Sequence, residues 1–213
     1  MSGQFDVSSA QRSIDPGRPL IIVDADEVVL SFVDGFDRFL RTQDLFLDLT
    51  SYRLHGNVKR LTDRTPLLDV EVTALLEEFR ADLDSLEAIP GVCESLTMLS
   101  EIATIVVLSN VTPAQARARS RNLLSLGLDL PLIANSGAKG LAVKALAARV
   151  QAPGFFIDDI PQHLASAAEH APEVFRIHFV ADAKLRGLLP LTFHANYEAG
   201  DWAATATFIT AHL

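Results

Sequence analysis

Carboxylate, hydroxyl and ammonium groups recur in this chain directly beside short apolar runs. Carboxylates that crowd together at neutral pH repel one another unless a cation lies among them. Oxygen ligands suit Mg2+, which takes one or two protein carboxylates together with waters and a substrate phosphate. The sequence therefore predicts a site for Mg2+ and phosphate built from Asp24 and Asp26 after Leu20–Val23, Ser109 and Asn110 after residues 105–108, Lys139 at a helix start, and Asp158 and Asp159 after residues 155–157.

The apolar runs are predicted to be strands of one sheet. Each run is short and bounded by turn or helix-start signals, and segments with helical spacing lie between the runs. Alternating strands and helices are typical of a parallel sheet with helices on both faces, and ligands bind such sheets beyond the carboxyl ends of the strands. Further strands are predicted at 132–133 and 174–179, and helices at 112–124, 139–150, 161–168 and after Trp202.

Residues 31–88 interrupt this alternation. They are predicted to be mostly helical with no convincing strand, and Pro66 is expected to begin a helix. A helical insertion directly after the first strand would divide the chain into three parts. These are a flexible N-terminal arm (residues 1–18), an α/β core (19–30 and 89–213) and a helical cap (31–88).

The composition limits the classes of partner. The formal charge at pH 7 is −9 over 213 residues, and an acidic surface repels nucleic acid and anionic lipid. The polar N-terminus has no apolar segment of signal-peptide length, and no run of about 18 apolar residues is present. We therefore expect a soluble cytoplasmic protein, monomer or homodimer, with a small molecule as its substrate rather than nucleic acid or a membrane.

In their order along the chain, the four segments resemble the motifs of the haloacid dehalogenase (HAD) superfamily, in its phosphatase branch. The first motif is an apolar strand and Asp-x-Asp, here Ile21-Ile22-Val23-Asp24-Ala25-Asp26. The second is a strand ending in Ser or Thr, the third a Lys at a helix start, and the fourth a strand with an acidic pair. The resemblance covers roughly residue 19 to the C-terminus. It implies a Rossmann-like three-layer α/β core with a small α-helical cap domain inserted between the first two motifs.

The resemblance also implies a reaction. The chain would be a Mg2+-dependent phosphomonoester hydrolase that acts on a small phosphorylated metabolite through an aspartyl-phosphate intermediate. Asp24 would be the nucleophile. Asp26 would protonate the leaving alkoxide and then deprotonate the hydrolytic water.

The same resemblance assigns the binding groups. Ser109, the Asn110 backbone and Lys139 would bind phosphate, and Lys139 is preferred over Lys144 because it starts its helix. The carboxylate of Asp24, the backbone carbonyl of Asp26 and one or both carboxylates of the acidic pair Asp158 and Asp159 would hold Mg2+.

Two parts of the sequence leave alternatives open. In the predicted cap, Arg53, His55, Lys59 or Arg60 could contact an anionic leaving group, or could be solvated surface charges. Glu27 stands where a small Gly is frequent in the superfamily, so the shape of the loop after Asp26 is open.

Other functions share parts of the pattern. A receiver-type signalling domain carries similar residues in a different order and has no place for the insertion. A dehalogenase would lack the second acid of the first motif, so Asp26 argues against it. A phosphotransferase or phosphomutase of the same superfamily, or a catalytically silent binding protein, remains an alternative.

Overall fold

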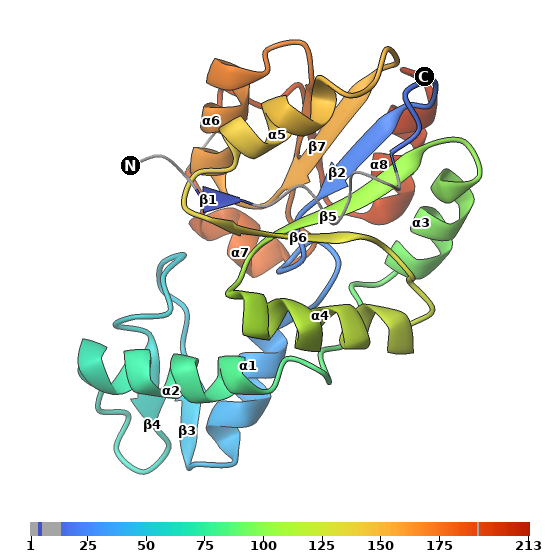
Figure 1. Cartoon of the computed structure of the whole chain (residues 1–213). Helices are drawn as coiled ribbons and strands as arrows, with labels where there is room; N and C mark the ends of the chain where they lie inside the picture. The colour runs from blue at the N-terminus through green and yellow to red at the C-terminus, as the bar shows by residue number, and fades with distance from the viewer. Residues whose placement is uncertain (1–3, 6–13, 191) are drawn as a thin grey trace.

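The computed structural model describes residues 4–5, 14–190 and 192–213. The strands in this part of the chain are β1 (Gln4–Phe5), β2 (Leu20–Val23), β3 (Leu45–Leu47), β4 (Val58–Arg60), β5 (Thr104–Asn110), β6 (Leu132–Ser136), β7 (Gly154–Asp158), β8 (Phe175–Phe179) and β9 (Tyr197–Ala199). Seven of them form one sheet in the order β1-β6-β5-β2-β7-β8-β9 (Figure 1). All neighbours in this sheet are parallel except β1, which pairs antiparallel with β6.

Helices cover both faces of this sheet. They are α1 (Phe32–Arg41), α2 (Asp69–Ala81), α3 (Val92–Ser100), α4 (Pro113–Ser125), α5 (Gly140–Ala147), α6 (Pro161–His170), α7 (Ala183–Leu188) and α8 (Trp202–Thr210). Successive strand residues face opposite sides. In β2, Leu20 and Ile22 belong to an apolar cluster with side chains of α5 and α6, whereas Ile21 and Val23 belong to one with side chains of α3 and α8. The three-layer α/β core predicted from the sequence is thus confirmed.

Most core elements lie where the sequence predicts them. β2 has the predicted bounds, and α4 begins at Pro113. The Thr112 hydroxyl accepts the N–H of Gln115 at 3.3 Å, and the Gln115 side chain accepts the N–H of Thr112 at 2.9 Å. This reciprocal pair is a capping box at the N-terminus of α4. The predictions omit α7 and β9, which are short and carry little periodicity.

The cap segment (residues 31–88) is not purely helical. It contains α1 and α2, but β3 and β4 also pair as an antiparallel sheet, so the prediction of no strand is wrong at 45–47 and 58–60. α2 begins at Asp69 rather than at Pro66. The reason is local: the N–H of Leu67 donates to the carbonyl of Val58 at 2.9 Å, which holds the preceding residues alongside β4.

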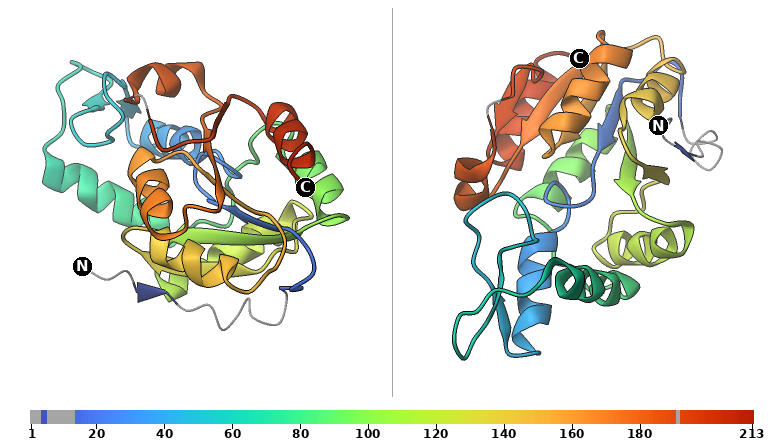
Figure 2. Two further views of the ribbon diagram at one scale, coloured as in Figure 1. Left: turned by 90° about the horizontal axis from the view of Figure 1, so that it is seen from above. Right: turned by 90° about the vertical axis from the view of Figure 1, so that its left-hand side faces the viewer.

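Figure 1 shows the cap segment beyond the carboxyl ends of β2 and β7, and both views of Figure 2 show it to one side of the sheet. It is joined to the core by apolar contacts, because Phe36 of α1 and Phe79 of α2 belong to the same cluster as Ile21 and Val23 of β2. The Asn122 side chain of α4 adds hydrogen bonds to the backbone of Leu86. The cap segment is therefore packed against the edge of the sheet where the predicted site lies.

The predicted N-terminal arm, residues 1–18, falls largely outside the described residues. Within the described part, Gln4–Phe5 forms β1 at the sheet edge, so these two residues do not match the expectation of a loose arm. Among the described helices, none combines the length and apolar character that a membrane span requires.

Candidate active site

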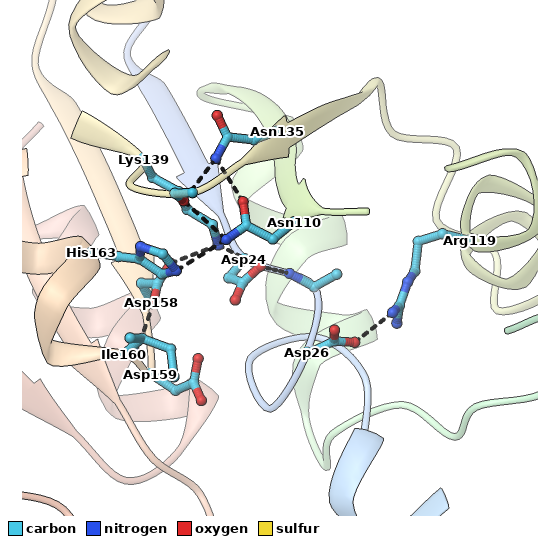
Figure 3. A network of polar contacts seen from close by, with 12 residues as sticks. Asp24, Asp26, Asn110, Arg119, Asn135, Lys139, Asp158, Asp159, Ile160 and His163 are labelled. Atoms are coloured by element: carbon cyan, nitrogen blue, oxygen red, sulfur yellow. Dashed lines mark hydrogen bonds and ion pairs between the residues drawn. The ribbon is translucent and has the colours of Figure 1, made fainter. Parts of the chain in front are cut away.

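Lys139 joins two of the predicted site carboxylates. Its ammonium nitrogen lies 2.6 Å from Oδ1 of Asp24 and 2.7 Å from Oδ2 of Asp158 (Figure 3). Asp24 follows β2 and Asp158 ends β7, and these strands are neighbours in the sheet, so the register brings the two carboxylates together. Lys139 is wholly buried, whereas Lys144 is exposed on α5. Of the two lysines that the sequence offers, the structure places Lys139 in the site.

Asp159 completes a group that we call the lysine cluster (Asp24, Lys139, Asp158 and Asp159). The three buried carboxylates each offer an oxygen, and these oxygens lie within 4.8 Å of one another. Burial raises the pKa of Asp24 to about 6, although the charge of Lys139 opposes the shift. Burial and the charges of Asp158 and Asp24 also raise the pKa of Asp159. One ammonium faces three carboxylates, so the site favours a further positive charge.

The two residues of the acidic pair have different partners. Asp158 accepts from Lys139 through Oδ2 and from the N–H of Ile160 through Oδ1 at 2.8 Å. Asp159 accepts the hydroxyl of Tyr52 through Oδ2. Burial, together with the charge of Asp159, raises the pKa of Tyr52 above its usual range, so this phenol is a donor. Tyr52 belongs to the cap segment, and the sequence analysis does not identify it.

Asn110 holds the backbone that leads into Lys139. Its Nδ2 donates to the carbonyl of Gly137 at 3.0 Å, and its Oδ1 accepts from Asn135 at 2.6 Å. Nε2 of His163 lies 3.3 Å from the same Nδ2. Burial, and then the charge of Lys139, lowers the pKa of His163 to about 4, so the imidazole is neutral and accepts this hydrogen bond. The Asn110 side chain thus ties β5, β6 and α6 together beside the lysine cluster.

Ser109 is placed next to these groups but is not bonded to them. Its side chain is buried on β5, and its hydroxyl has no hydrogen-bond partner among the described residues. A buried hydroxyl without a partner is uncommon and costs stability. The hydroxyl therefore has an unused hydrogen-bonding capacity, although Ser109 is not among the residues that line the cavity described below.

Asp26 does not face the same way as Asp24, although residues two apart in an extended chain point to the same side. The N–H of Leu30 donates to the carbonyl of Ala25 at 2.8 Å, so the chain leaves the extended conformation and turns after Asp24. Figure 3 shows Asp26 directed toward Arg119 of α4, and their nearest atoms are 2.6 Å apart. Asp26 and Arg119 form what we call the arginine pair. Arg119 is absent from the sequence prediction because nothing in its local pattern marks it.

Glu27 supplies the backbone shape of this turn. Its φ is 58°, in the left-handed region that glycine adopts most readily, so the loop has the conformation that a Gly would provide. The N–H of Val33 donates to Oε1 of Glu27 at 2.6 Å, so the carboxylate caps α1 from outside the helix. Burial raises the pKa of Glu27 to about 7.

A cavity of about 250 Å³ lies between the lysine cluster and the cap segment. Within the described residues it is lined by Asp24, Asp26, Glu27, Phe32, Val33, Leu49, Tyr52, Leu54, Arg80, Asn110, Lys139, Asp159, Ile160, His163 and Leu185. His163 of α6 is one of these residues.

The four cap residues that could contact an anionic leaving group are not among them. Lys59 pairs with Asp48 at 2.8 Å, and Arg60 pairs with Glu71 at 3.3 Å. His55 is hydrogen-bonded to Thr73, and Arg53 is exposed. The structure therefore supports the alternative that these are surface residues of the cap.

Comparison with solved structures shows the fold. The defluorinating L-2-haloacid dehalogenase Rha0230 is 14% identical with a TM-score of 0.60, over 91% of this chain and 95% of that one. A HAD-family hydrolase from Deinococcus radiodurans R1, solved with bound phosphate and sodium, is 16% identical with a TM-score of 0.57 over 93% and 97%. The HAD-hydrolase YfnB from Bacillus subtilis, bound to magnesium, is 10% identical with a TM-score of 0.55 over 92% and 99%.

The likeness at these identities concerns the fold, and it confirms the fold that the sequence resemblance predicts: the chain has the haloacid dehalogenase-like fold. No model of a protein family matches the sequence, and no curated protein does either.

Proposed function

We propose that this chain is a Mg2+-dependent phosphomonoester hydrolase with Asp24 as its nucleophile. The lysine cluster carries the proposal: the Lys139 ammonium contacts both Asp24 and Asp158 in a buried group of three carboxylates at the carboxyl edge of the sheet. A small phosphorylated metabolite is the proposed substrate, and the cavity of about 250 Å³ beside the cluster is where it would bind.

The donor set fits a divalent cation. Three carboxylates against one ammonium leave two negative charges, and every ligand atom is an oxygen. Asp24 and Asp159, with the backbone carbonyl of Asp26, would hold Mg2+. Asp159 is the better direct ligand of the acidic pair, because both oxygens of Asp158 already accept hydrogen bonds, from Lys139 and from Ile160. When bound, Mg2+ would neutralise charge on the phosphoryl oxygens.

The protein groups have separate tasks in this proposal. An Asp24 carboxylate oxygen forms a bond to phosphorus while the bond from phosphorus to the leaving oxygen breaks. Asp26 gives a proton to that leaving oxygen. In the second half-reaction it takes a proton from the water that attacks phosphorus, while the bond from phosphorus to the Asp24 oxygen breaks. Lys139 offsets the charge of Asp24 and of the transferred group, and the Ser109 hydroxyl can donate to a phosphoryl oxygen.

A phosphate-release assay over a panel of phosphomonoesters, with Mg2+ and with a chelator, tests the proposal. Wild type should release phosphate only with the metal, and Asp24→Asn should lose at least about 10³-fold in kcat/KM because the nucleophile is gone. Trapping of the aspartyl-phosphate by mass spectrometry should succeed in wild type and fail in Asp24→Asn. Full activity of Asp24→Asn would remove Asp24 from the reaction.

A dehalogenase is the second candidate, because Asp26 faces Arg119 rather than Asp24. The same assay should therefore include short 2-haloacids with halide release as the readout. Halide release without phosphate release would favour this candidate. Transfer of the phosphoryl group from the enzyme to a sugar phosphate would favour a phosphotransferase or phosphomutase, and inactivity in every assay would favour a silent binding protein.

A further inference from the structure

Arg119 is a buried cation whose hydrogen-bonding capacity is unused. Its side chain is 0% exposed, and one Nη lies 2.6 Å from an oxygen of Asp26. The two charges are close, but their directions do not suit a hydrogen bond: across the part of the chain that the structure describes, Nε and both Nη atoms of Arg119 have no hydrogen-bond partner, and neither has that oxygen of Asp26. The contact is a charge pair with poor geometry.

A guanidinium in this condition favours a different partner. It has five N–H donors in a fixed fork, and a buried donor without a hydrogen-bond partner lowers the stability of the fold. The fork matches a carboxylate or phosphate that binds through two oxygens at once, which gives shorter and stronger hydrogen bonds than a misaligned pair. An anion that approached Arg119 from a better direction would therefore compete with Asp26.

A second cavity borders the arginine pair. It measures about 980 Å³ and is lined by both members of the arginine pair and by Thr112 and Pro113 at the start of α4. Arg80 and Asn110 line this cavity and the first one, as does Asp26, so the two adjoin. The N-terminus of a 13-residue helix adds partial positive charge at its wall.

The charges along the second cavity are mixed. Glu77 of α2 also lines it and is exposed, while Arg80 lies one turn further along the same helix. The centre of the Phe32 ring lies 5.6 Å from the Arg80 guanidinium carbon, and Arg80 lines both cavities. Arg80 balances Glu77 there, and Arg119 remains the buried cation at the cavity wall.

We propose that the second cavity is the leaving-group subsite and that Arg119 binds a second anionic group, a carboxylate or a phosphate, on the leaving alcohol. This inference rests on the proposed phosphomonoester hydrolase, whose substrate class it narrows. It also gives Asp26 two positions. Without substrate the Asp26 carboxylate faces Arg119; when the substrate anion takes Arg119, the Asp26 carboxylate is released, takes up a proton from solvent and gives it to the leaving oxygen.

Matched pairs of substrates test the subsite. One pair is the phosphate ester of a short hydroxy acid and that of the corresponding hydroxy amide; the other is a diol bisphosphate and its monophosphate. Wild type should prefer the charged member of at least one pair about tenfold or more in kcat/KM, since a bidentate anion contact is lost in the neutral one. The pair that shows the preference identifies the anionic group that Arg119 binds, either a carboxylate or a phosphate.

Variants on α4 assign the preference to Arg119. In Arg119→Gln the ratio within the pair should fall to near one, and in Arg119→Lys it should be reduced, because an ammonium cannot bind two oxygens in the same plane. Arg117→Gln removes an exposed arginine from the same helix and should leave the ratio as in wild type. A ratio near one in wild type, or a ratio unchanged in Arg119→Gln and Arg119→Lys, overturns the proposal.

A binding measurement separates this inference from the proposed function. Calorimetry with Asp24→Asn should show the charged compounds binding about tenfold more tightly than their neutral partners, and the difference should disappear in Asp24→Asn/Arg119→Gln. If no ester is hydrolysed by any variant but this difference is found, the hydrolase fails and the anion subsite stands. If Arg119→Gln does not fold by circular dichroism, Arg119→Lys decides both measurements.

Discussion

The lysine cluster and the arginine pair both connect the segment after β2 to the rest of the site, but they are bonded differently. In the lysine cluster, Lys139 contacts two carboxylates at 2.6 and 2.7 Å, and Asp158 accepts a backbone N–H as well. In the arginine pair, the charges lie 2.6 Å apart without a hydrogen bond between the described groups. Both cations are almost completely shielded from solvent.

The difference separates a fixed half of the site from an adjustable half. Breaking a well-bonded buried group leaves charges uncompensated in a medium of low dielectric, so the lysine cluster is expected to keep one arrangement. The arginine pair loses no hydrogen bond when Arg119 exchanges Asp26 for another anion. The nucleophile therefore lies in the fixed half and the proton carrier in the adjustable half, which suits a reaction where Asp26 acts at two different oxygens.

The largest expected effect comes from breaking the fixed half. Lys139→Met leaves three buried carboxylates without their cation and should destabilise the protein by about 3–5 kcal/mol, measured by urea unfolding without metal. The loss should be greater at pH 8 than at pH 5. Removing the ammonium favours protonation of the carboxyls, and at pH 5 they take up protons and their repulsion falls.

Lys144→Met is the matched control. This lysine belongs to the same helix but is exposed, and its replacement should change stability by less than about 0.5 kcal/mol. Equal effects of the two substitutions would show that the lysine cluster does not depend on its ammonium.

The sequence predicts the fixed half well and the adjustable half poorly. Asp24, Asp158 and Asp159 each follow an apolar run, and Lys139 stands at a helix start. Parallel strands bring the ends of such runs to one edge. The same logic fails for Asp26, because it assumes an extended chain through a stretch that turns. Glu27 signals the turn only through its left-handed φ, a conformation that the identity of a glutamate does not suggest.

Contacts between segments that are distant along the chain are also missing from the sequence prediction. Tyr52 and Asp159 are 107 residues apart, and neither sequence neighbourhood indicates the other. Arg119 looks like any arginine on a helix, and its burial depends on how α4 packs. In the cap segment, β3 and β4 have three residues each, which is too short for a period to be recognised. Charged residues such as Lys59 and Arg60 drew attention by composition, although Asp48 and Glu71 neutralise them.

Glu27 lies in the turn between the two halves, and we expect its replacement to have an intermediate effect on stability that depends on pH. Its pKa is about 7 in the folded protein against 4.5 as the ordinary value, so the folded state holds the proton more tightly. The stability that this contributes is complete below about pH 4.5 and is lost as pH rises through 7. Between pH 4.5 and pH 7.5 the free energy of unfolding of wild type should therefore fall by on the order of 1–2 kcal/mol relative to that of Glu27→Gln.

Urea unfolding of both proteins at pH 4.5, 5.5, 6.5 and 7.5 measures this difference. Gln keeps an oxygen that can accept the N–H of Val33, so the cap of α1 is retained and the titration is removed. Glu101→Gln, at an exposed glutamate, should show no such trend. A stability difference between wild type and Glu27→Gln that is constant with pH would mean that the turn does not bury the carboxyl.

The smallest expected effect tests whether the cap segment is part of the fixed half. Tyr52→Phe removes the hydroxyl that donates to Asp159 and should cost about 1 kcal/mol in unfolding without metal, because Asp159 loses a hydrogen bond and keeps its burial. Tyr197→Phe is the control, since Tyr197 stacks on Phe208 away from the lysine cluster. Mg2+ titration followed by calorimetry should show a several-fold change in affinity for Tyr52→Phe, because the hydroxyl shares Asp159 with the proposed metal. If Tyr52→Phe leaves the affinity for Mg2+ unchanged, as Tyr197→Phe should, the cap segment does not contribute to the lysine cluster. Arg119 and the second cavity would then be the proposed route by which a substrate affects the site.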